Sequence, residues 1–588
     1  MKAIRRTKIV CTLGPTVDNP EAVRELLRAG MNVARCNFSH GTHEEHRERI
    51  ARLRRVAAEE HVPVAIMLDT KGPEIRTGKL RDGAEYELSA DDRITITTED
   101  VLGTRERVSI SYRLLPKEMS PGGHIYVADG LIDLEVESIE GSEIHCVVRS
   151  GGTLGSRKNV NIPGVRVQLP AITEKDKDDI LFGIAEGVDL IAASFIRKPG
   201  DIEDIKAVLR EHDSAIRVIA KIEDQEGLSN IDEIARVSDG VMVARGDLGV
   251  QLAIEDIPLA QKRIILIANT LNKPVITATQ MLDSMIQNPR PTRAELTDVA
   301  NAIFDGTDAV MLSGETANGR YPTRACETLD RIARAVEASA EYRDRCASRN
   351  AVHGTGHDIG DAIARSTVTI ALNTAATAII APSLRGNTPR MLSKYRPAQP
   401  IIAVTTTEAV QRQLLLYWGI IPLVSAEVAD SERMVQNAIG HALERGYIEA
   451  ADRVVTAAGI PLRSAIPMNT IKIHILGNVL NRGHDGFGGK VTGRVVRATD
   501  AAQAHRRLKL DGTEVLVTPV LTEDHLDLVP GLAGVVVEDQ SQVAHEILHR
   551  MNERLALISE VPDPLSGLEN GMTVTIDGDE KILYEGVL

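Results

Sequence analysis

The chain has 588 residues, 43% of them hydrophobic and 26% charged, and its formal net charge at pH 7 is −15. This length is too great for a single hydrophobic core and predicts about three to five domains. Because acidic and basic residues are interspersed, the composition argues against a general surface for nucleic acid or for an anionic membrane. The cysteines form no Cys-x-x-Cys pair, and there is neither a signal-like segment nor an apolar stretch of roughly 18 residues, so we expect a cytoplasmic protein.

Eight short apolar runs rich in β-branched residues, most of them separated by helical patterns, dominate the first part of the chain. They occupy residues 8–14, 31–37, 64–69, 190–195, 218–223, 240–244, 274–279 and 309–313. Continuous apolar runs are typical of parallel strands that are buried on both faces. We therefore predict an α/β fold, a (β/α)8 TIM barrel over residues 1–70 and 169–347, with its chemistry at the C-terminal strand ends. An open doubly wound sheet is the alternative.

The third βα unit is interrupted by a segment of a different character. The helical period disappears there, and short alternating stretches appear at 93–97, 107–111, 124–128 and 132–137. Gly-containing turn pairs separate these stretches. We predict a small β-barrel domain over residues 71–168 that is inserted in a barrel loop and acts as a lid.

Two further domains are expected after the barrel. Following a helical pattern at 323–341, a polar segment at 344–358 is interpreted as a linker. Residues 348–477 then alternate helices with strands and predict a regulatory α/β domain, with strands at 378–381, 401–404, 453–456 and 471–475. A glycine-rich stretch at 480–489 is interpreted as a second linker. The last domain, 486–588, has strand-like runs at 515–517 and 534–537 and a hairpin near Asp577.

The run at 218–223 carries two charged residues that are two positions apart. Alternate residues of a strand share a face, so Lys221 and Glu223 project in the same direction. The alternative to a functional pair is a buried structural ion pair.

A second candidate follows the next strand, where Gly246 and Gly249 flank Asp247. Glycines allow backbone N–H groups to approach an anionic ligand closely. Asp247 beside Glu223 would form a two-carboxylate site suited to Mg²⁺. The alternative is a turn with an Asx motif.

The third cluster lies after the second and third strands. Arg35 and Arg76 can form a guanidinium clamp for a phosphoryl group. Four neighbouring residues supply only oxygen ligands, as a monovalent or hard divalent cation requires: Asn37, Ser39, Asp69 and Thr70. Taken singly these are ordinary loop residues, and their shared place at adjacent strand ends favours function.

These segments resemble the pyruvate kinase family. The resemblance rests on TKIVCTLGP at 7–15, NFSHG at 37–41, DTKGPEIRTG at 69–78, MVARGDLG at 242–249, and a stretch at 278–316 that begins ATQMLDSM and ends LSGET. It covers roughly residues 1–476. It implies transfer of the phosphoryl group of phosphoenolpyruvate to ADP, giving pyruvate and ATP, with Mg²⁺ (or Mn²⁺) and K⁺ as cofactors.

The resemblance also implies roles for individual residues. Arg35 and Lys221 would contact the phosphoryl group, Glu223 and Asp247 would hold Mg²⁺, and Asn37, Ser39, Asp69 and Thr70 would hold K⁺. Gly246, Asp247 and Thr279 would contact the pyruvate part, with Thr279 a candidate proton relay. The nucleotide would be bound by Asn37, Phe38, Ser39, His40, Arg76 and, from the lid, Lys158. A glutamate at the position of Glu74 goes with K⁺ dependence in this family.

The family further implies a homotetramer and a phosphorylated allosteric effector. The effector loop of bacterial members matches residues 383–388, where Arg385 replaces a small hydroxyl residue; a surface loop without a ligand is the alternative. Residues 486–588 resemble the mobile phosphohistidine domain of phosphoenolpyruvate-utilising enzymes. His545 is kept there, but the Gly-Gly and Thr-Ser pairs that precede it in the motif are not. We therefore expect a structural or assembly role for this domain.

Two other functions are weighed against the kinase. A metal-dependent lyase acting on pyruvate enolate would use a Glu/Asp metal pair but would need neither the lid nor Lys221. A non-catalytic metabolite sensor would be expected to lose Lys221, Glu223 or Asp247, and the sequence has all three.

Overall fold

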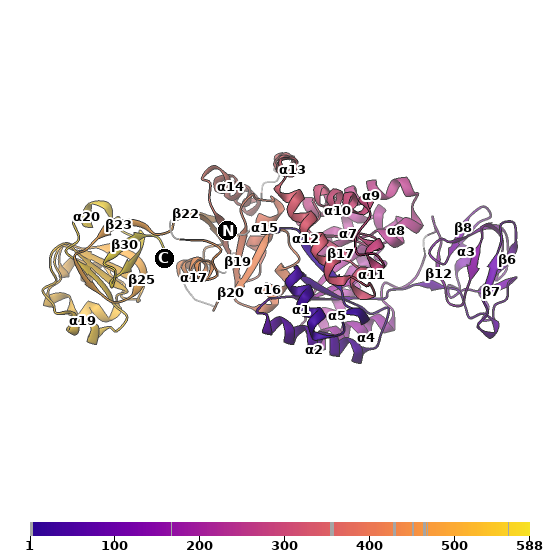
Figure 1. The fold of residues 1–588 in the computed structure, drawn as a ribbon, viewed down its shortest axis with the longest axis horizontal. Coiled ribbons are helices and arrows are strands. Elements are labelled where there is room, and N and C mark those ends of the chain that lie inside the picture. The colour runs from indigo at the N-terminus through magenta and orange to yellow at the C-terminus, as the bar shows by residue number, and fades with distance from the viewer. Residues whose placement is uncertain are drawn as a thin grey trace. The chain divides into compact units, whose positions relative to one another are not determined.

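Eight parallel strands close into a barrel, as the eight apolar runs predict (Figure 1). In this computed structural model they are β1 (Lys8–Thr12), β2 (Val33–Asn37), β3 (Ala65–Asp69), β13 (Leu190–Ala193), β14 (Arg217–Ile222), β15 (Gly240–Ala244), β16 (Val275–Ala278) and β17 (Ala309–Leu312). The barrel is closed because β17 pairs with β1, with Lys8 opposite Ala309. The open doubly wound sheet is therefore excluded.

The structure describes residues 4–165, 167–352, 358–426, 431–449, 452–461, 466, 468–562 and 564–587. They divide into two compact units. One contains the barrel and the inserted domain, Ala3–Ser348, together with Arg412–Gly419, and the other contains Arg349–Gln411 and Ile420–Leu588. None of the described helices is both long and apolar enough to cross a membrane.

Helices follow the barrel strands. The longer ones are α1 (Pro20–Ala29), α2 (His43–Glu59), α4 (Glu174–Ala185), α5 (Pro199–Glu211), α9 (Ile257–Thr270), α10 (Arg293–Asp305) and α12 (Pro322–Ala338), and the short ones are α6 (Gln225–Ser229), α7 (Ile231–Val237), α8 (Arg245–Gln251) and α11 (Gly314–Ala317). Three of them begin with reciprocal capping boxes, in which Thr42, Thr173 and Thr292 exchange hydrogen bonds with an acidic residue three positions on. Local sequence therefore defines where these helices start.

The inserted segment is a β domain with its own core, as predicted. Its seven-stranded sheet has the order β4 (Ile75–Arg76), β12 (Asn159–Asn161), β8 (His124–Val127), β9 (Ile132–Glu140), β10 (Glu143–Ser150), β6 (Arg93–Thr97) and β7 (Arg107–Ser109), and β11 (Gly152–Leu154) pairs separately with β5 (Tyr86–Leu88). The short helix α3 (Leu115–Glu118) follows β7. All of the pairings are antiparallel except that of β6 with β7.

The α/β domain contains a five-stranded sheet, which confirms its predicted class. Its order is β20 (Ile420–Val424), β19 (Ile401–Thr405), β18 (Ala378–Pro382), β21 (Arg453–Ala458) and β22 (Thr470–Ile475), with helices α14 (Ile359–Asn373), α15 (Asn387–Lys394), α16 (Glu408–Leu414) and α17 (Ser431–Glu444). The linker predicted at 344–358 is wrong over 344–352, because these residues continue α13 (Ala340–Val352). Their polarity reflects a helix surface, on which Arg345 pairs with Glu341 one turn earlier. The rest of that prediction, apart from Asp358, lies outside the described residues.

The last domain is built on an eight-stranded sheet. Its order is β23 (Asn478–Arg482), β30 (Ile582–Glu585), β29 (Thr573–Asp577), β25 (Lys490–Arg497), β26 (Glu514–Thr518), β27 (Gly534–Val537), β28 (Ala556–Ser559) and β24 (Asp485–Phe487), with helices α18 (Ala501–Arg507), α19 (His545–Met551) and α20 (Pro564–Gly567). The predicted terminal hairpin is β29–β30. The linker predicted at 480–489 is wrong, since it contains strands β23 and β24. A Cβ atom on Gly486 would lie 2.6 Å from the Leu557 carbonyl oxygen, so this glycine permits close strand approach rather than flexibility.

Candidate active site

Lys221 and Glu223 do project together from the end of β14. The Nζ atom of Lys221 lies 2.9 Å from Oε1 of Glu223 and 3.2 Å from Oδ1 of Asp69, and it donates to Oγ of Ser194 at 2.7 Å. Burial lowers the pKa of Lys221, but the charges of Asp69 and Glu223 outweigh it and raise the net pKa above its ordinary value. The buried ammonium group therefore stays protonated at neutral pH.

Asp69 links this lysine to Arg35. The Nε atom of Arg35 lies 2.6 Å from Oδ2 of Asp69, and Nη1 of Arg35 donates to Oγ1 of Thr12 at 3.0 Å. Burial raises the pKa of Asp69, but Arg35 and Lys221 hold it below its ordinary value. Arg35, Asp69, Lys221 and Glu223 thus form a continuous charged chain across β2, β3 and β14, with two cationic groups held at fixed positions.

Asp247 faces Glu223 from α8, the helix that follows β15. Burial and the nearby Glu223 carboxylate raise the pKa of Asp247 to about 7. Two facing carboxyl groups in a buried place are stable only if they hold a proton or a cation between them. Within the described ranges no group of three or more His, Cys, Asp or Glu residues forms a metal cage. The carboxyl groups of Glu223 and Asp247 fit a hard divalent ion, which would take its remaining ligands from substrate and water.

Thr279 has an unusual backbone conformation directly after β16. Its φ angle is +64°, which is rare for a β-branched residue and typical of strained functional positions. In this conformation its hydroxyl accepts a hydrogen bond from the backbone N–H of Gly246 at 2.8 Å and donates one to the Ala278 carbonyl at 2.7 Å. The structure thus brings Thr279, Gly246 and Asp247 together at neighbouring strand ends.

The predicted K⁺ ligands lie where β2 and β3 end. Asn37 stands directly opposite Asp69 in the register of the two strands, and Thr70 follows Asp69. The side-chain oxygen of Asn37 accepts from the Ser39 backbone N–H at 3.1 Å, and the Thr70 hydroxyl accepts from the Ser194 N–H at 3.1 Å. These oxygen atoms therefore come from one short arc of the barrel rim.

Arg76 and Lys158 lie at neighbouring strands of the lid. Arg76, in β4, is opposite Asn159, the residue after Lys158, in the register of β4 and β12. The Nε atom of Arg76 donates to Glu74 at 2.7 Å, and one of its terminal nitrogens donates to the Arg157 carbonyl at 2.9 Å. Both predicted nucleotide-binding cations are thus presented by one edge of the lid sheet.

Phe38 and His40 differ in what they present. The ring of Phe38 is buried and stacks on His46 with ring centroids 4.0 Å apart, so it belongs to the barrel core. The carbonyl oxygen of His40 lies 2.9 Å from Nε2 of His46. The backbone N–H of Phe38 donates to the Asp69 carbonyl at 3.0 Å and its carbonyl accepts from Nζ of Lys175 at 3.0 Å, so Phe38 is fixed by the barrel through its ring and its backbone alike.

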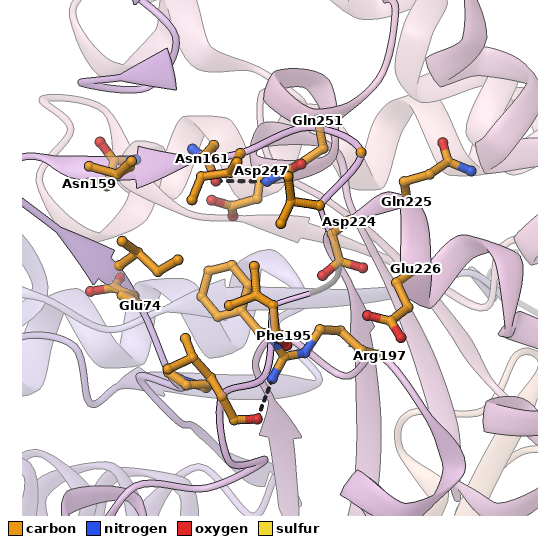
Figure 2. A pocket seen from close by; sticks show the side chains of 18 of the residues that line it. Glu74, Asn159, Asn161, Phe195, Arg197, Asp224, Gln225, Glu226, Asp247 and Gln251 are labelled. Carbon is orange, nitrogen blue, oxygen red and sulfur yellow. Dashed lines mark hydrogen bonds between the residues drawn. The ribbon is translucent and has the colours of Figure 1, made fainter. Parts of the chain in front are cut away.

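A cavity of about 250 Å³ lies between the barrel and the lid (Figure 2). Its walls include Glu74, Asp247 and four residues that sequence reasoning missed: Asn161, Phe195, Arg197 and Gln251. The Phe195 N–H donates to Oε2 of Glu223 at 2.5 Å, and Arg197 donates to the carbonyls of Val167 and Leu169 at 2.8 and 2.9 Å. The missed residues Ser194 to Arg197 follow the fourth barrel strand, so the rule that chemistry lies at strand ends was the available signal.

Comparisons with known proteins agree with this geometry. The family model "Pyruvate kinase, barrel domain" matches residues 4–326, and "Pyruvate kinase, alpha/beta domain" matches residues 361–474. The chain belongs to the pyruvate kinase family. It is 45% identical over 586 residues to a pyruvate kinase of Geobacillus stearothermophilus and 43% identical over 585 residues to one of Staphylococcus aureus (strain USA300), in each case over 99% of both chains.

A solved structure shows the same likeness. The crystal structure of a pyruvate kinase from Cryptosporidium parvum matches with a TM-score of 0.77 and 42% identity, covering 80% of this chain and 96% of that one. These matches confirm the activity predicted from the sequence: the chain is a phosphotransferase with pyruvate kinase activity. Because the bacterial pyruvate kinases match over 99% of their length, their alignments extend through the last domain.

Proposed function

We propose that this pyruvate kinase transfers the phosphoryl group of phosphoenolpyruvate to ADP beside the charged chain from Arg35 to Glu223. The observation that carries the proposal is the placement of two fixed cations, Arg35 and Lys221, next to the facing carboxyl groups of Glu223 and Asp247. Phosphoryl transfer depends mainly on positioning and on neutralising charge, which this arrangement supplies.

The residues of the site have different tasks in the proposed mechanism. Arg35 and Lys221 neutralise the phosphoryl oxygens, and Asp69 keeps both cations in place. Glu223 and Asp247 hold Mg²⁺, which supplies positive charge for the oxygen atoms of the reactants. Gly246 and Thr279 orient the pyruvate part, and the strained backbone of Thr279 fixes its hydroxyl. Arg76, Lys158 and the 37–40 stretch bind the nucleotide.

A proton and Mg²⁺ compete for the Asp247 carboxylate, so the effect of Mg²⁺ on stability should depend on pH. Its pKa of about 7 lies above that of an unfolded aspartate, so the metal-free protein loses stability as pH rises from about 4 to 7. Mg²⁺ must displace this proton at pH 6 but not at pH 8, and apparent affinity falls about tenfold for each pH unit below the pKa. We therefore expect subsaturating Mg²⁺ to raise Tm more at pH 8 than at pH 6, as measured by thermal unfolding. Equal shifts at both pH values would contradict this.

We assign K⁺ binding to Asn37, Ser39, Asp69 and Thr70, and the family resemblance links Glu74 to K⁺ dependence. Glu74 lines the cavity (Figure 2), and its carboxylate accepts from Nε of Arg76 at 2.7 Å and lies 3.6 Å from Nζ of Lys71. We expect Glu74→Lys to raise turnover in the absence of K⁺ by roughly tenfold, because an ammonium group would replace about 1.4 kcal/mol of the cation's stabilisation. Pyruvate formation is measured across a K⁺ titration. Glu226→Lys, in the same cavity wall, serves as the control, and an unchanged titration for Glu74→Lys would remove this assignment.

The direct test of the proposed function is pyruvate formation from phosphoenolpyruvate, ADP and Mg²⁺, with and without K⁺. Fast turnover that depends on K⁺ is the expected result. Turnover without K⁺ would keep the reaction and overturn the cation site. No turnover by a folded sample, even with a panel of sugar phosphates and nucleotides, would favour the lyase or the sensor.

The remaining assignments are also proposals. The domain limits 1–70 with 169–347, 71–168, 348–477 and 486–588 are supported by the separate sheets.

The loop before α15, with Gly386 at φ +74°, is the proposed place of a phosphorylated effector. Homotetramer assembly and a cytoplasmic location follow from the family. His545 lies 3.2 Å from Asp485 and its ring contacts Phe487, which suits the structural role proposed for the last domain.

A further inference from the structure

The lid contacts the barrel at the C-terminal end of α8. The side-chain nitrogen of Gln251, the last residue of α8, donates to the side-chain oxygen of Asn161 in β12 at 3.1 Å (Figure 2). A second contact lies beside it, since a Cβ atom on Gly130 of the lid would stand 3.3 Å from a methyl carbon of Val250. Asn161 is buried, and the hydrogen bond from Gln251 gives its side-chain oxygen a protein partner.

The two ends of this contact carry the residues that hold the two substrates. In the lid, Asn161 is three residues from Lys158, roughly 10 Å along an extended strand. In the barrel, α8 begins with Arg245, which is fixed to Asp298 at 2.7 Å and to the Thr279 carbonyl at 2.7 Å, and it includes Asp247. A hydrogen bond between the two ends therefore sets the position of Lys158 relative to the proposed metal and pyruvate site.

We propose that Gln251 and Asn161 form a latch that holds β12 against α8 and thereby positions Lys158 for the phosphates of a nucleoside diphosphate. The proposal rests on the nucleotide role proposed for Lys158. Gln251 touches neither reactant in it and is a positioning residue. The latch makes the binding-competent position of the lid more populated. Apparent nucleotide affinity rises by the same factor as that population.

The test is Gln251→Met, which keeps the length of the side chain and removes its donor. Loss of one neutral hydrogen bond predicts about a five-fold rise in KM for ADP. We expect kcat to stay within about two-fold and KM for phosphoenolpyruvate to be unchanged, because the barrel residues hold that substrate. Gln225→Met is the matched control: Gln225 lines the same cavity and bonds Ser229, on the barrel side. The Gln225→Met variant should keep the wild-type kcat and the wild-type KM for both ADP and phosphoenolpyruvate.

Two further measurements separate a latch from a general structural role. If the two residues act through each other, Asn161→Leu combined with Gln251→Met raises KM for ADP no more than either change alone. The exchanged pair Asn161→Gln with Gln251→Asn keeps the combined length and is expected to restore the KM at least in part. A wild-type KM in folded Gln251→Met, or additive effects in the double variant, overturns the latch.

The same series distinguishes failure of the latch from failure of the nucleotide site. Lys158→Met is expected to raise KM for ADP by more than Gln251→Met does. If Lys158→Met leaves that KM unchanged, the nucleotide role proposed for the lid is wrong and the latch falls with it. If Lys158→Met raises it and Gln251→Met does not, only the latch is overturned.

Discussion

Replacing Lys221 with methionine is expected to lower kcat by about 10³-fold while Mg²⁺ binding survives. The loss follows from removing a buried, protonated ammonium group that is held within 3.2 Å of Asp69 and Glu223 and is placed beside the transferring group. Removing one preorganised charge or donor from such a site costs about 10²–10³ in rate, and cationic groups at phosphoryl transfer reach more. Pyruvate formation measures kcat, and the Mg²⁺-induced rise in Tm measures metal binding.

The matched control for this prediction is Lys206→Met in α5. Lys206 donates to the Val237 carbonyl at 2.6 Å and pairs with Asp239, so the same change removes a partly buried ammonium group away from the site. It should leave kcat unchanged and affect stability alone. Near-normal turnover of Lys221→Met would remove Lys221 from the mechanism, and loss of its Mg²⁺ response would show that the change disturbs the metal site.

Much of the barrel could be predicted because its strands are short and buried on both faces. In that setting apolar runs are continuous, and polar residues at or just past the end of a run mark the rim. Lys221, Glu223 and Thr279 were found in this way. The family resemblance then supplied roles that residue patterns alone left open, since a buried ion pair and a catalytic pair have the same spacing.

The features that escaped prediction depend on contacts between distant residues or on backbone angles. Neither the positive φ of Thr279 nor the bond from the Phe195 N–H to Glu223 follows from residue type. Trp418 shows the same limit. It comes from the segment Arg412–Gly419 and belongs to the barrel core, and its backbone N–H donates to Oδ1 of Asp308 at 3.2 Å, although about 100 residues separate it from the barrel strands.

Polar and glycine-rich stretches were misleading for a related reason. Composition cannot tell a linker from a solvent-exposed helix such as α13, nor a flexible hinge from a strand such as β24, which needs Gly486 for close packing. In both cases the tertiary environment decides whether the backbone groups find partners. The linkers were therefore the least predictable part of the fold.

The facing carboxyl groups lead to the second large effect, which has opposite signs in stability and activity. Asp247→Asn replaces a carboxyl group whose pKa is about 7 with a neutral group of the same shape. Above pH 7 this removes a partly buried negative charge next to Glu223, so the metal-free variant is expected to have a Tm at pH 8 equal to or higher than that of the wild type. The same change removes a charged ligand, so the Mg²⁺-induced rise in Tm should disappear and turnover should fall by about 10³-fold.

Asp224→Asn is the matched control for this variant. Burial raises the pKa of Asp224 to about 6, it lines the same cavity, and its carboxylate caps α6 by accepting from the Gly227 N–H at 2.7 Å. Asparagine also caps helices well, so this variant should keep both its Mg²⁺ response and its turnover. If Asp247→Asn keeps a wild-type Mg²⁺ shift, the metal is held elsewhere. If both variants lose it equally, the response reports the charge of the whole cavity and not a ligand. Because Lys221→Met is expected to lose turnover and keep its Mg²⁺ response, the two substitutions together separate metal binding from stabilisation of the transferring group.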